Sequence, residues 1–340
     1  MNLNIDLEQS DNVLITGGAG YCGSRLVPQL LEQGYKIIVY DTFYFGRTVI
    51  PPHPNLSLIE GDIRDIKKLS KLFQGVDSVI NLACISNDAS FELDEKLSTS
   101  VNMTAFEPIV SSAKNAGVKR FIFASSSSVY GVSEAKDVTE NHPLVPLTLY
   151  NKYKGMCEPI LFKYIDNNFT GVVFRPATVC GFSPRQRLDL SVNILTNLAI
   201  NKREITVFGG SQMRPNLHIQ DYCDVLKLFL HVKAEKINGK VFNVGYQNLT
   251  IEEIANLVKK VVEEHFPGPE ITIKKTTSDD NRSYHINSDK IKNELGFNPK
   301  FTIVDAIKEL CEAFQKGFLP NSLEDPKYFN VKLLKKLNIN

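Results

Sequence analysis

The chain has 340 residues, 43% hydrophobic and 23% charged, with a formal net charge of +1 at pH 7. This length accommodates one large α/β domain and a smaller one. The near-neutral balance offers no electrostatic footprint for nucleic acid, and no apolar run reaches the roughly 18 residues of a membrane span. Residues 1–11 are too polar for a signal peptide. We therefore expect neither a nucleic-acid partner nor a membrane.

The six cysteines are scattered along the chain and form no Cys-x-x-Cys pair. Such spacing favours reduced, mostly buried thiols over a disulfide framework or a zinc site. The sequence therefore predicts a cytoplasmic protein without a metal.

The first predicted element is a buried strand, Asn-Val-Leu-Ile over 12–15. The glycine-rich turn Thr-Gly-Gly-Ala-Gly-Tyr-Cys-Gly follows over 16–23, and apolar residues at helical spacing predict a helix over 24–31. Such a unit cradles a pyrophosphate, because glycines let the backbone approach the phosphates and the helix start offers unpaired N–H groups. The cofactor contacts predicted in this turn are Gly17, Gly20, Tyr21, Cys22 and Gly23.

A second short strand over 36–40 ends at Asp41. A carboxylate at this distance accepts hydrogen bonds from an adenosine ribose and repels a 2′-phosphate, which favours NAD over NADP. The alternative is an ordinary aspartate that begins a turn. The spacing Gly-x-x-Gly-x-x-Gly resembles that of the short-chain dehydrogenase/reductase superfamily, and this resemblance requires a Tyr-x-x-x-Lys motif further along the chain.

Strand and helix signals then alternate through the first half of the chain. The expected elements are a strand at 56–60, a helix at 65–73, a strand at 78–83, a long helix at 97–117 and a strand at 120–125. Alternation of this kind predicts a doubly wound parallel sheet of the Rossmann type, with helices on both faces. We expect residues 1–180 to form this NAD-binding domain.

The pattern changes in the second half, where residues 181–340 are expected to form mainly a smaller α/β substrate-binding domain, with some elements returning to the main sheet. A strand is predicted at 205–208, and helices are predicted at 188–201, 221–233, 251–264, 289–295 and 303–316. The tail over 332–337 reads as a short basic amphipathic helix, to which no function is assigned.

The required motif is present as Tyr150-Asn151-Lys152-Tyr153-Lys154. At positions i and i+4 of a helix, Tyr150 and Lys154 share one face. An adjacent ammonium group favours the phenolate form of a tyrosine, which makes the phenol a usable base near neutral pH. Taken alone, this motif is common in helices and mostly structural.

The block Phe-Ala-Ser-Ser-Ser-Ser-Val-Tyr-Gly over 123–131 resembles the extended short-chain enzymes of the NAD-dependent nucleotide-sugar epimerase/dehydratase family. The resemblance covers nearly the whole chain. It implies that Ser126 is the catalytic hydroxyl beside Tyr150 and Lys154, and that homodimers form through two long helices. The further cofactor contacts that it implies are Asp62, Ile63, Leu82, Ala83, Asn102, Tyr150, Lys154 and Pro176.

The resemblance also implies a site for a nucleotide-diphosphate sugar. The expected substrate contacts are Ser86, Ser127, Asn193, Arg214 and Arg282. A surface ion pair is the alternative for Arg214. Arg185 and Arg187 add two cations nearby, which solvated loop arginines explain equally well.

The dehydratases of this family carry an Asp-Glu pair directly after the catalytic hydroxyl, where this chain has Ser127 and Ser128. Without those carboxyl groups, elimination of water has no evident acid–base catalyst. The sequence therefore favours a 4-epimerase that oxidises the sugar at C4 and returns the hydride to its other face. The alternatives are a nucleotide-sugar 4-dehydrogenase, less plausibly a 4,6-dehydratase, and an NAD-binding sensor without catalysis.

Overall fold

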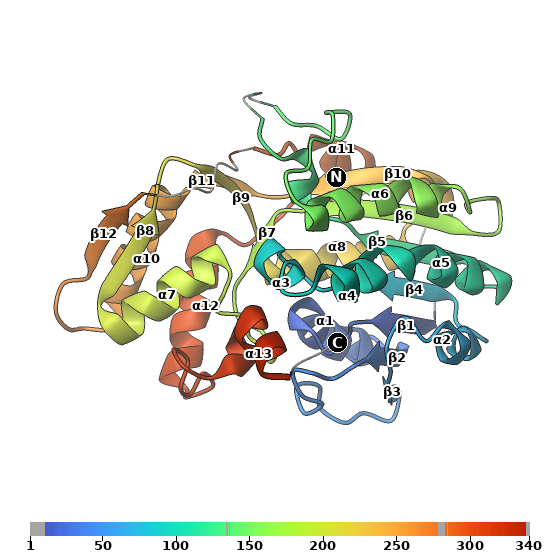
Figure 1. Cartoon of the computed structure of the whole chain (residues 1–340), viewed down its shortest axis with the longest axis horizontal. Helices are drawn as coiled ribbons and strands as arrows, with labels where there is room; N and C mark the ends of the chain where they lie inside the picture. Colours follow the sequence, from blue (N-terminus) through green and yellow to red (C-terminus); the bar gives the residue numbers. More distant parts are fainter. Residues whose placement is uncertain (1–10, 134, 136, 278–282, 284, 338–340) are drawn as a thin grey trace.

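The computed structural model describes residues 11–133, 135, 137–277, 283 and 285–337 (Figure 1). Seven parallel strands form the main sheet in the order β10-β6-β5-β4-β1-β2-β3. Their bounds are β1 Asn12–Thr16, β2 Lys36–Asp41, β3 Leu56–Glu60, β4 Ser78–Asn81, β5 Arg120–Ala124, β6 Thr170–Pro176 and β10 Lys240–Val244. The predicted doubly wound parallel sheet is confirmed.

The sheet is covered on both faces, which explains why its strands read as continuous apolar runs. In β1, Val13 and Ile15 pack into one hydrophobic cluster and Leu14 into the cluster on the other face. The first cluster includes residues of α1 (Tyr21–Glu32), α8 (Ile219–His231) and α11 (Asp289–Leu295). The second includes residues of α2 (Ile66–Leu72), α5 (Phe106–Asn115) and α6 (Leu149–Phe162).

The strand order reverses at β1. The chain continues from β1 to β2 and β3 on one side, then returns to β4 on the other side. In open α/β sheets the crevice outside the carboxyl ends of the strands at such a switch point is where ligands bind. The glycine-rich turn after β1 therefore lies at the position that the fold favours for a ligand.

The helix predicted over 97–117 is interrupted. Its observed parts are α4 (Glu95–Thr99), a π-helical turn over Ser100–Thr104 and α5. Pro108 has no N–H group to bond to Thr104, and the amide of Ala105 bonds to the carbonyl of Ser100 instead. The turn directs Asn102 toward the loop after β4. There its side chain accepts a hydrogen bond from the backbone N–H of Ile85 and donates one to the carbonyl of Ile85, each at 2.8 Å.

The second half of the chain builds a separate core from α7 (Ser191–Lys202), α10 (Ile251–His265) and α12 (Ile303–Gln315). These helices pack beside two small sheets (Figure 1). One sheet joins β7 (Thr178–Cys180), β9 (Met213–His218) and β11 (Gln247–Thr250), and the other pairs β8 (Glu204–Phe208) with β12 (Thr272–Thr276). β10 and α8, also from this half, belong to the main sheet and its covering layer.

The remaining helical elements are α3 (Asp88–Phe91), α9 (Ala234–Ile237), α13 (Asn330–Leu337) and 3₁₀ turns over Ser127–Tyr130 and Pro326–Tyr328. The predicted tail helix is thus present, and it begins two residues earlier than expected. Over the described ranges, no helix combines the length and apolarity needed to cross a bilayer.

Candidate active site

A cleft of about 1600 Å³ opens at the carboxyl ends of the main-sheet strands, and residues from both halves of the chain line it. The glycine-rich turn, Asp41 and Asp62 line it from the side of the main sheet, and Phe208 and Arg214 line it from the small sheets of the second half. Pockets for a single small ligand usually measure about 300–1000 Å³. This volume suits two ligands in line, such as a dinucleotide and a nucleotide sugar.

The glycine-rich turn has the geometry of a pyrophosphate cradle. Gly17 has a φ of +70°, and a Cβ there would lie 2.6 Å from the backbone nitrogen of Ala83, so only glycine fits. Gly20 begins α1 without a side-chain cap, and Tyr21 and Cys22 of its first turn line the cleft. The side chain of Tyr21 is fastened elsewhere, since its hydroxyl donates to the carbonyl of Gly181 at 2.7 Å. The backbone N–H groups at the start of α1 therefore remain available to bind an anion.

Asp41 ends β2 beside this turn. Its carboxylate accepts hydrogen bonds from the amides of Ala19 at 2.9 Å and Phe43 at 2.8 Å, which orient it along the cleft wall. Burial raises the pKa of Asp41 above its usual value, and these amides oppose the rise. A carboxylate keeps lone pairs for further donors, so Asp41 retains the capacity to accept ribose hydroxyls.

Asp62 lines the cleft from the same side and forms an ion pair with Arg64 at 2.7 Å. Burial alone would raise the pKa of Asp62, but the hydrogen bonds from Arg64 bring it below its usual value. Asp62 is therefore a fixed anion on the dinucleotide side of the cleft.

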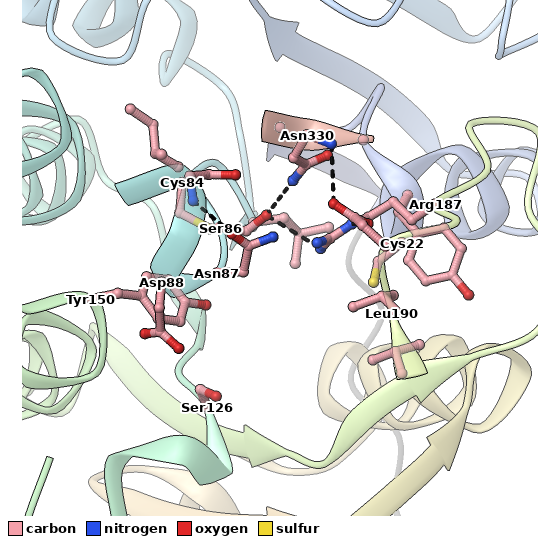
Figure 2. A pocket seen from close by; sticks show the side chains of 18 of the residues that line it. Cys22, Cys84, Ser86, Asn87, Asp88, Ser126, Tyr150, Arg187, Leu190 and Asn330 are labelled. Atoms are coloured by element: carbon pink, nitrogen blue, oxygen red, sulfur yellow. Dashed lines mark hydrogen bonds and ion pairs between the residues drawn. The ribbon is translucent and has the colours of Figure 1, made fainter. Parts of the chain in front are cut away.

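The predicted catalytic residues Ser126, Tyr150 and Lys154 all line the cleft, and Figure 2 shows Ser126 and Tyr150 among its lining residues. Thr148 caps α6 by accepting a hydrogen bond from the Asn151 amide at 3.3 Å, which starts the helix just before Tyr150. One turn later, the buried Lys154 ammonium donates to the carbonyl of Ala124 at 2.7 Å. Ser126 follows β5 and shares a 2.7 Å hydrogen bond with the hydroxyl of Ser128.

A buried ion pair supports these residues from behind. Arg175 of β6 contacts Glu158 of α6 at 2.6 Å, and both side chains are at most 5% exposed. The same carboxylate accepts a hydrogen bond from Ser125 at 2.6 Å. Because Ser125 precedes Ser126 and Glu158 lies one turn after Lys154, this network ties the end of β5 to α6.

Nearly all of the predicted site residues within the described ranges line the cleft. They are Gly17, Gly20, Tyr21, Cys22, Gly23, Asp41, Asp62, Ile63, Leu82, Ala83, Ser86, Ser126, Ser127, Tyr150, Lys154, Pro176 and Arg214.

Asn102 and Asn193 do not line this cleft. Asn102 holds the loop at Ile85 from behind, and the fully buried Asn193 bonds to the Gly181 amide at 3.0 Å and to the Tyr21 hydroxyl at 3.1 Å. Both side chains shape the cleft wall through its backbone. Arg282 lies outside the described residues.

The structure decides one alternative that the sequence left open and adds two cleft residues that sequence reasoning missed. Arg185 and Arg187, which the sequence left open between cations near the substrate site and solvated loop arginines, are only 4% and 9% exposed and line the cleft, so the solvated alternative is wrong. Asn330 and Asp88 also line the cleft, Asp88 at the start of α3 and Asn330 at the start of α13. The paired arginines were visible in the sequence, whereas nothing near Asn330 signalled a site.

The described part of the chain contains no evident set of metal ligands. No group of three or more His, Cys, Asp or Glu side chains is arranged there to hold an ion.

Comparison with known proteins decides which cofactor this is. A model described as the NAD dependent epimerase/dehydratase family matches residues 13–245. The chain belongs to this family. Membership confirms the resemblance seen in the sequence and identifies NAD as the cofactor. The glycine-rich turn has the geometry that the pyrophosphate of NAD requires.

Members of the NAD-dependent epimerase/dehydratase family resemble the chain over nearly its full length. The UDP-glucose 4-epimerase of Lactobacillus helveticus is 27% identical over 336 residues, covering 92% of this chain and 99% of that protein. The dTDP-D-glucose 4,6-dehydratase of Mus musculus is also 27% identical, over 322 residues, covering 90% and 89%.

Among solved structures, the UDP-glucose 4-epimerase of Thermotoga maritima with UDP-glucose superposes with a TM-score of 0.80 at 25% identity. The match covers 90% of this chain and 99% of that one. Epimerases and dehydratases thus match about equally well. The protein is an enzyme of nucleotide-sugar chemistry, and similarity alone does not choose its reaction.

Proposed function

We propose that the protein is an NAD-dependent nucleotide-sugar 4-epimerase. The observation that carries the proposal is the set of side chains around Ser126. Tyr150 as the base and Lys154 as its supporting cation line the same cleft. The next two residues after Ser126 carry hydroxyl groups, Ser127 and Ser128. The Ser128 hydroxyl donates to the side chain of Asn151, so it serves to fix the loop.

In this proposal Tyr150 removes the proton from the C4 hydroxyl of the sugar and later returns it. Ser126 donates a hydrogen bond to the same oxygen as its carbon changes between alcohol and ketone. Lys154 holds its positive charge beside the phenol, anchored by the carbonyl of Ala124. NAD bound along the glycine-rich turn supplies the hydride acceptor and donor.

A 4-epimerase needs no further acid or base, because the ketone only has to present its other face. A 4,6-dehydratase must also expel the C6 hydroxyl as water, which takes a general acid and a base. The two positions after Ser126 carry neither. This difference favours epimerisation over elimination.

The side of the cleft formed by the small sheets supports a nucleotide diphosphate as the handle of the substrate. Arg214 on β9 lines the cleft together with Phe208 and Ile251. A planar guanidinium matches a diphosphate with two parallel hydrogen bonds, and apolar neighbours suit the flat face of a base. Asn193 and Arg282 remain proposed contributors to this subsite, and a homodimer remains the proposed assembly.

Product analysis with a panel of UDP-, GDP-, CDP- and dTDP-sugars tests the proposal. An inverted C4 centre, seen by NMR without net NADH, is the expected result. An accumulating ketone with stoichiometric NADH would instead identify the 4-dehydrogenase, and a 6-deoxy product would overturn the reasoning from Ser127 and Ser128. An absence of turnover with every sugar, despite bound NAD, would favour the sensor.

A further inference from the structure

Two buried guanidinium groups lie beside the glycine-rich turn, on the loop between β7 and α7. This loop is fastened to the first turn of α1, where the amide of Arg185 donates to the Ser24 hydroxyl at 3.1 Å and the Ser183 hydroxyl donates to the carbonyl of Tyr21 at 2.7 Å. Arg185 and Arg187 are therefore held on the side of the cleft that receives the dinucleotide.

Of the two arginines on this loop, one forms an ion pair within the described residues and the other does not. Arg187 has an anionic partner, since its Nε donates to Asp189 at 2.8 Å. Arg185 forms no ion pair with any residue in the described ranges; its guanidinium lies 3.5 Å from the centroid of the Phe45 ring and donates to Asn330. Burying a charge without a counter-charge in contact is costly, and the carboxylates of Asp189 and Asp41 act on Arg185 without forming an ion pair with it, so this arrangement favours an anionic ligand.

Two further observations support an unmet demand for hydrogen-bond acceptors. The Nε of Arg185 and one terminal nitrogen of Arg187, Nη2, are buried without a hydrogen-bond partner. Burial and the neighbouring Arg187 lower the pKa of Arg185 to about 9, because a second positive charge is unfavourable there. Both side chains line the cleft, where a ligand can supply the missing acceptors.

The C-terminal helix holds this loop in place through one residue. The buried side chain of Asn330 accepts a hydrogen bond from Arg185 and donates one to the Ser86 hydroxyl at 2.8 Å. The backbone N–H of Asn330 donates to the Asp189 carboxylate at 3.0 Å. Ser86 in turn accepts a bond from Arg187 at 3.3 Å (Figure 2). Asn330 thus connects α13 to both arginines and to the loop after β4.

The position of the arginines distinguishes between the two diphosphates that the cleft would take. The charge of Arg185 acts on Asp41, and the charges of both arginines act on Cys22 of the glycine-rich turn. Arg214 and Phe208, in contrast, lie on β9 and β8 of the two small sheets, outside the main sheet. Both charges therefore act at the glycine-rich turn, where the pyrophosphate of a dinucleotide would lie, and the charge of Arg187 also acts on Tyr150.

We propose that Arg185 and Arg187 bind the pyrophosphate of NAD beside the glycine-rich turn, and that Asn330 of the C-terminal helix positions them, so that docking of α13 sets how tightly NAD is held. The proposal depends on NAD binding in this cleft and not on which sugar reaction follows. Tight retention suits an epimerase, because the hydride must return to the same sugar before the cofactor leaves.

Cofactor binding by the full-length protein tests this. The NAD content of the purified protein and the Kd for NAD of the stripped protein are measured by extraction and calorimetry. We expect Arg185→Gln and Arg187→Gln each to weaken NAD binding about 10- to 100-fold, which is what one or two charge-assisted hydrogen bonds contribute. Asn330→Ala should weaken it about 5-fold or more, and Arg187→Lys should recover part of the loss.

The matched control is Lys336→Ala, which removes a cation from α13 at an exposed position outside the cleft and should leave the Kd unchanged. Melting curves without NAD separate loss of binding from loss of folding, and Arg185→Lys provides a folded variant that keeps the charge. Unchanged NAD affinity in folded glutamine variants would overturn the proposal. So would a loss confined to UDP and dTDP binding, which would assign the arginines to the sugar nucleotide.

Discussion

The buried pair of Glu158 and Arg175 makes a quantitative prediction about stability. The Glu158 carboxylate accepts three hydrogen bonds, from Ser125 at 2.6 Å and from Arg175 at 3.0 and 2.6 Å. Removing one partner leaves the other charge buried and unpaired, which costs about 3–5 kcal/mol. We therefore expect Glu158→Leu and Arg175→Met each to lower the free energy of unfolding by about that amount.

The double variant separates the two contributions. With both charges removed, what remains is the desolvation of the hydroxyls that bonded to them, at about 1–3 kcal/mol each. Taking the middle of each range, the double variant should therefore lose about 4 kcal/mol, against about 8 kcal/mol for the sum of the single variants. Urea unfolding of the NAD-free protein, followed by circular dichroism, measures all three.

The control is Lys316→Ala, which breaks an exposed pair with Glu312 and should cost less than about 1 kcal/mol. Losses in the double variant that equal the sum of the single losses, to within about 0.5 kcal/mol, would refute the reasoning. Such additivity would mean that the two side chains stabilise the fold independently and that their contact contributes nothing.

Three further predictions concern the site. Tyr150→Phe should lower turnover about 10²- to 10⁴-fold while the protein keeps its NAD, as measured by product NMR and extraction; turnover within 3-fold of wild type would exclude Tyr150 as the base. Gly17→Ala should abolish NAD binding in calorimetry, because the new Cβ meets the Ala83 backbone at 2.6 Å; full affinity would contradict the close approach. Contact with Arg187 outweighs burial and holds the pKa of Asp189 below its usual 3.8. The pair therefore stabilises the fold fully above about pH 4 and less as the pH falls further, so the stability gap between wild type and Asp189→Asn should narrow below that pH in urea titrations; a gap that widens there would reverse the sign.

The sequence predicted the elements whose signal is local. The apolar run of β1, the turn at Gly17 and the helix that positions Tyr150 each follow from a few adjacent residues, and all are present. The π-helical turn in the helix predicted over 97–117 was missed, because the helical pattern was continued through Pro108, the residue that removes a backbone hydrogen bond there.

The environment of the loop arginines could not be predicted, because it depends on residues far away along the chain. Whether Arg185 is solvated or buried depends on Ser24 and on Asn330, which lie 161 and 145 residues away along the chain. Such contacts arise from tertiary packing and leave no periodic pattern in a single sequence. Arg214, in contrast, was found because a family motif surrounds it, and its contact with a substrate stays a prediction.

The position of β10 has a consequence for how the chain folds during synthesis. β6 is buried along its whole length, and one of its two neighbours, β10, lies at Lys240–Val244. A ribosome adding about 5–20 residues per second needs roughly 3–14 s to proceed from Pro176 to Val244. Until then, β6 is an apolar edge strand that can pair with another chain. We expect fragments that end before β10 to aggregate, and nascent chains of this length to depend on chaperones that shield such an edge.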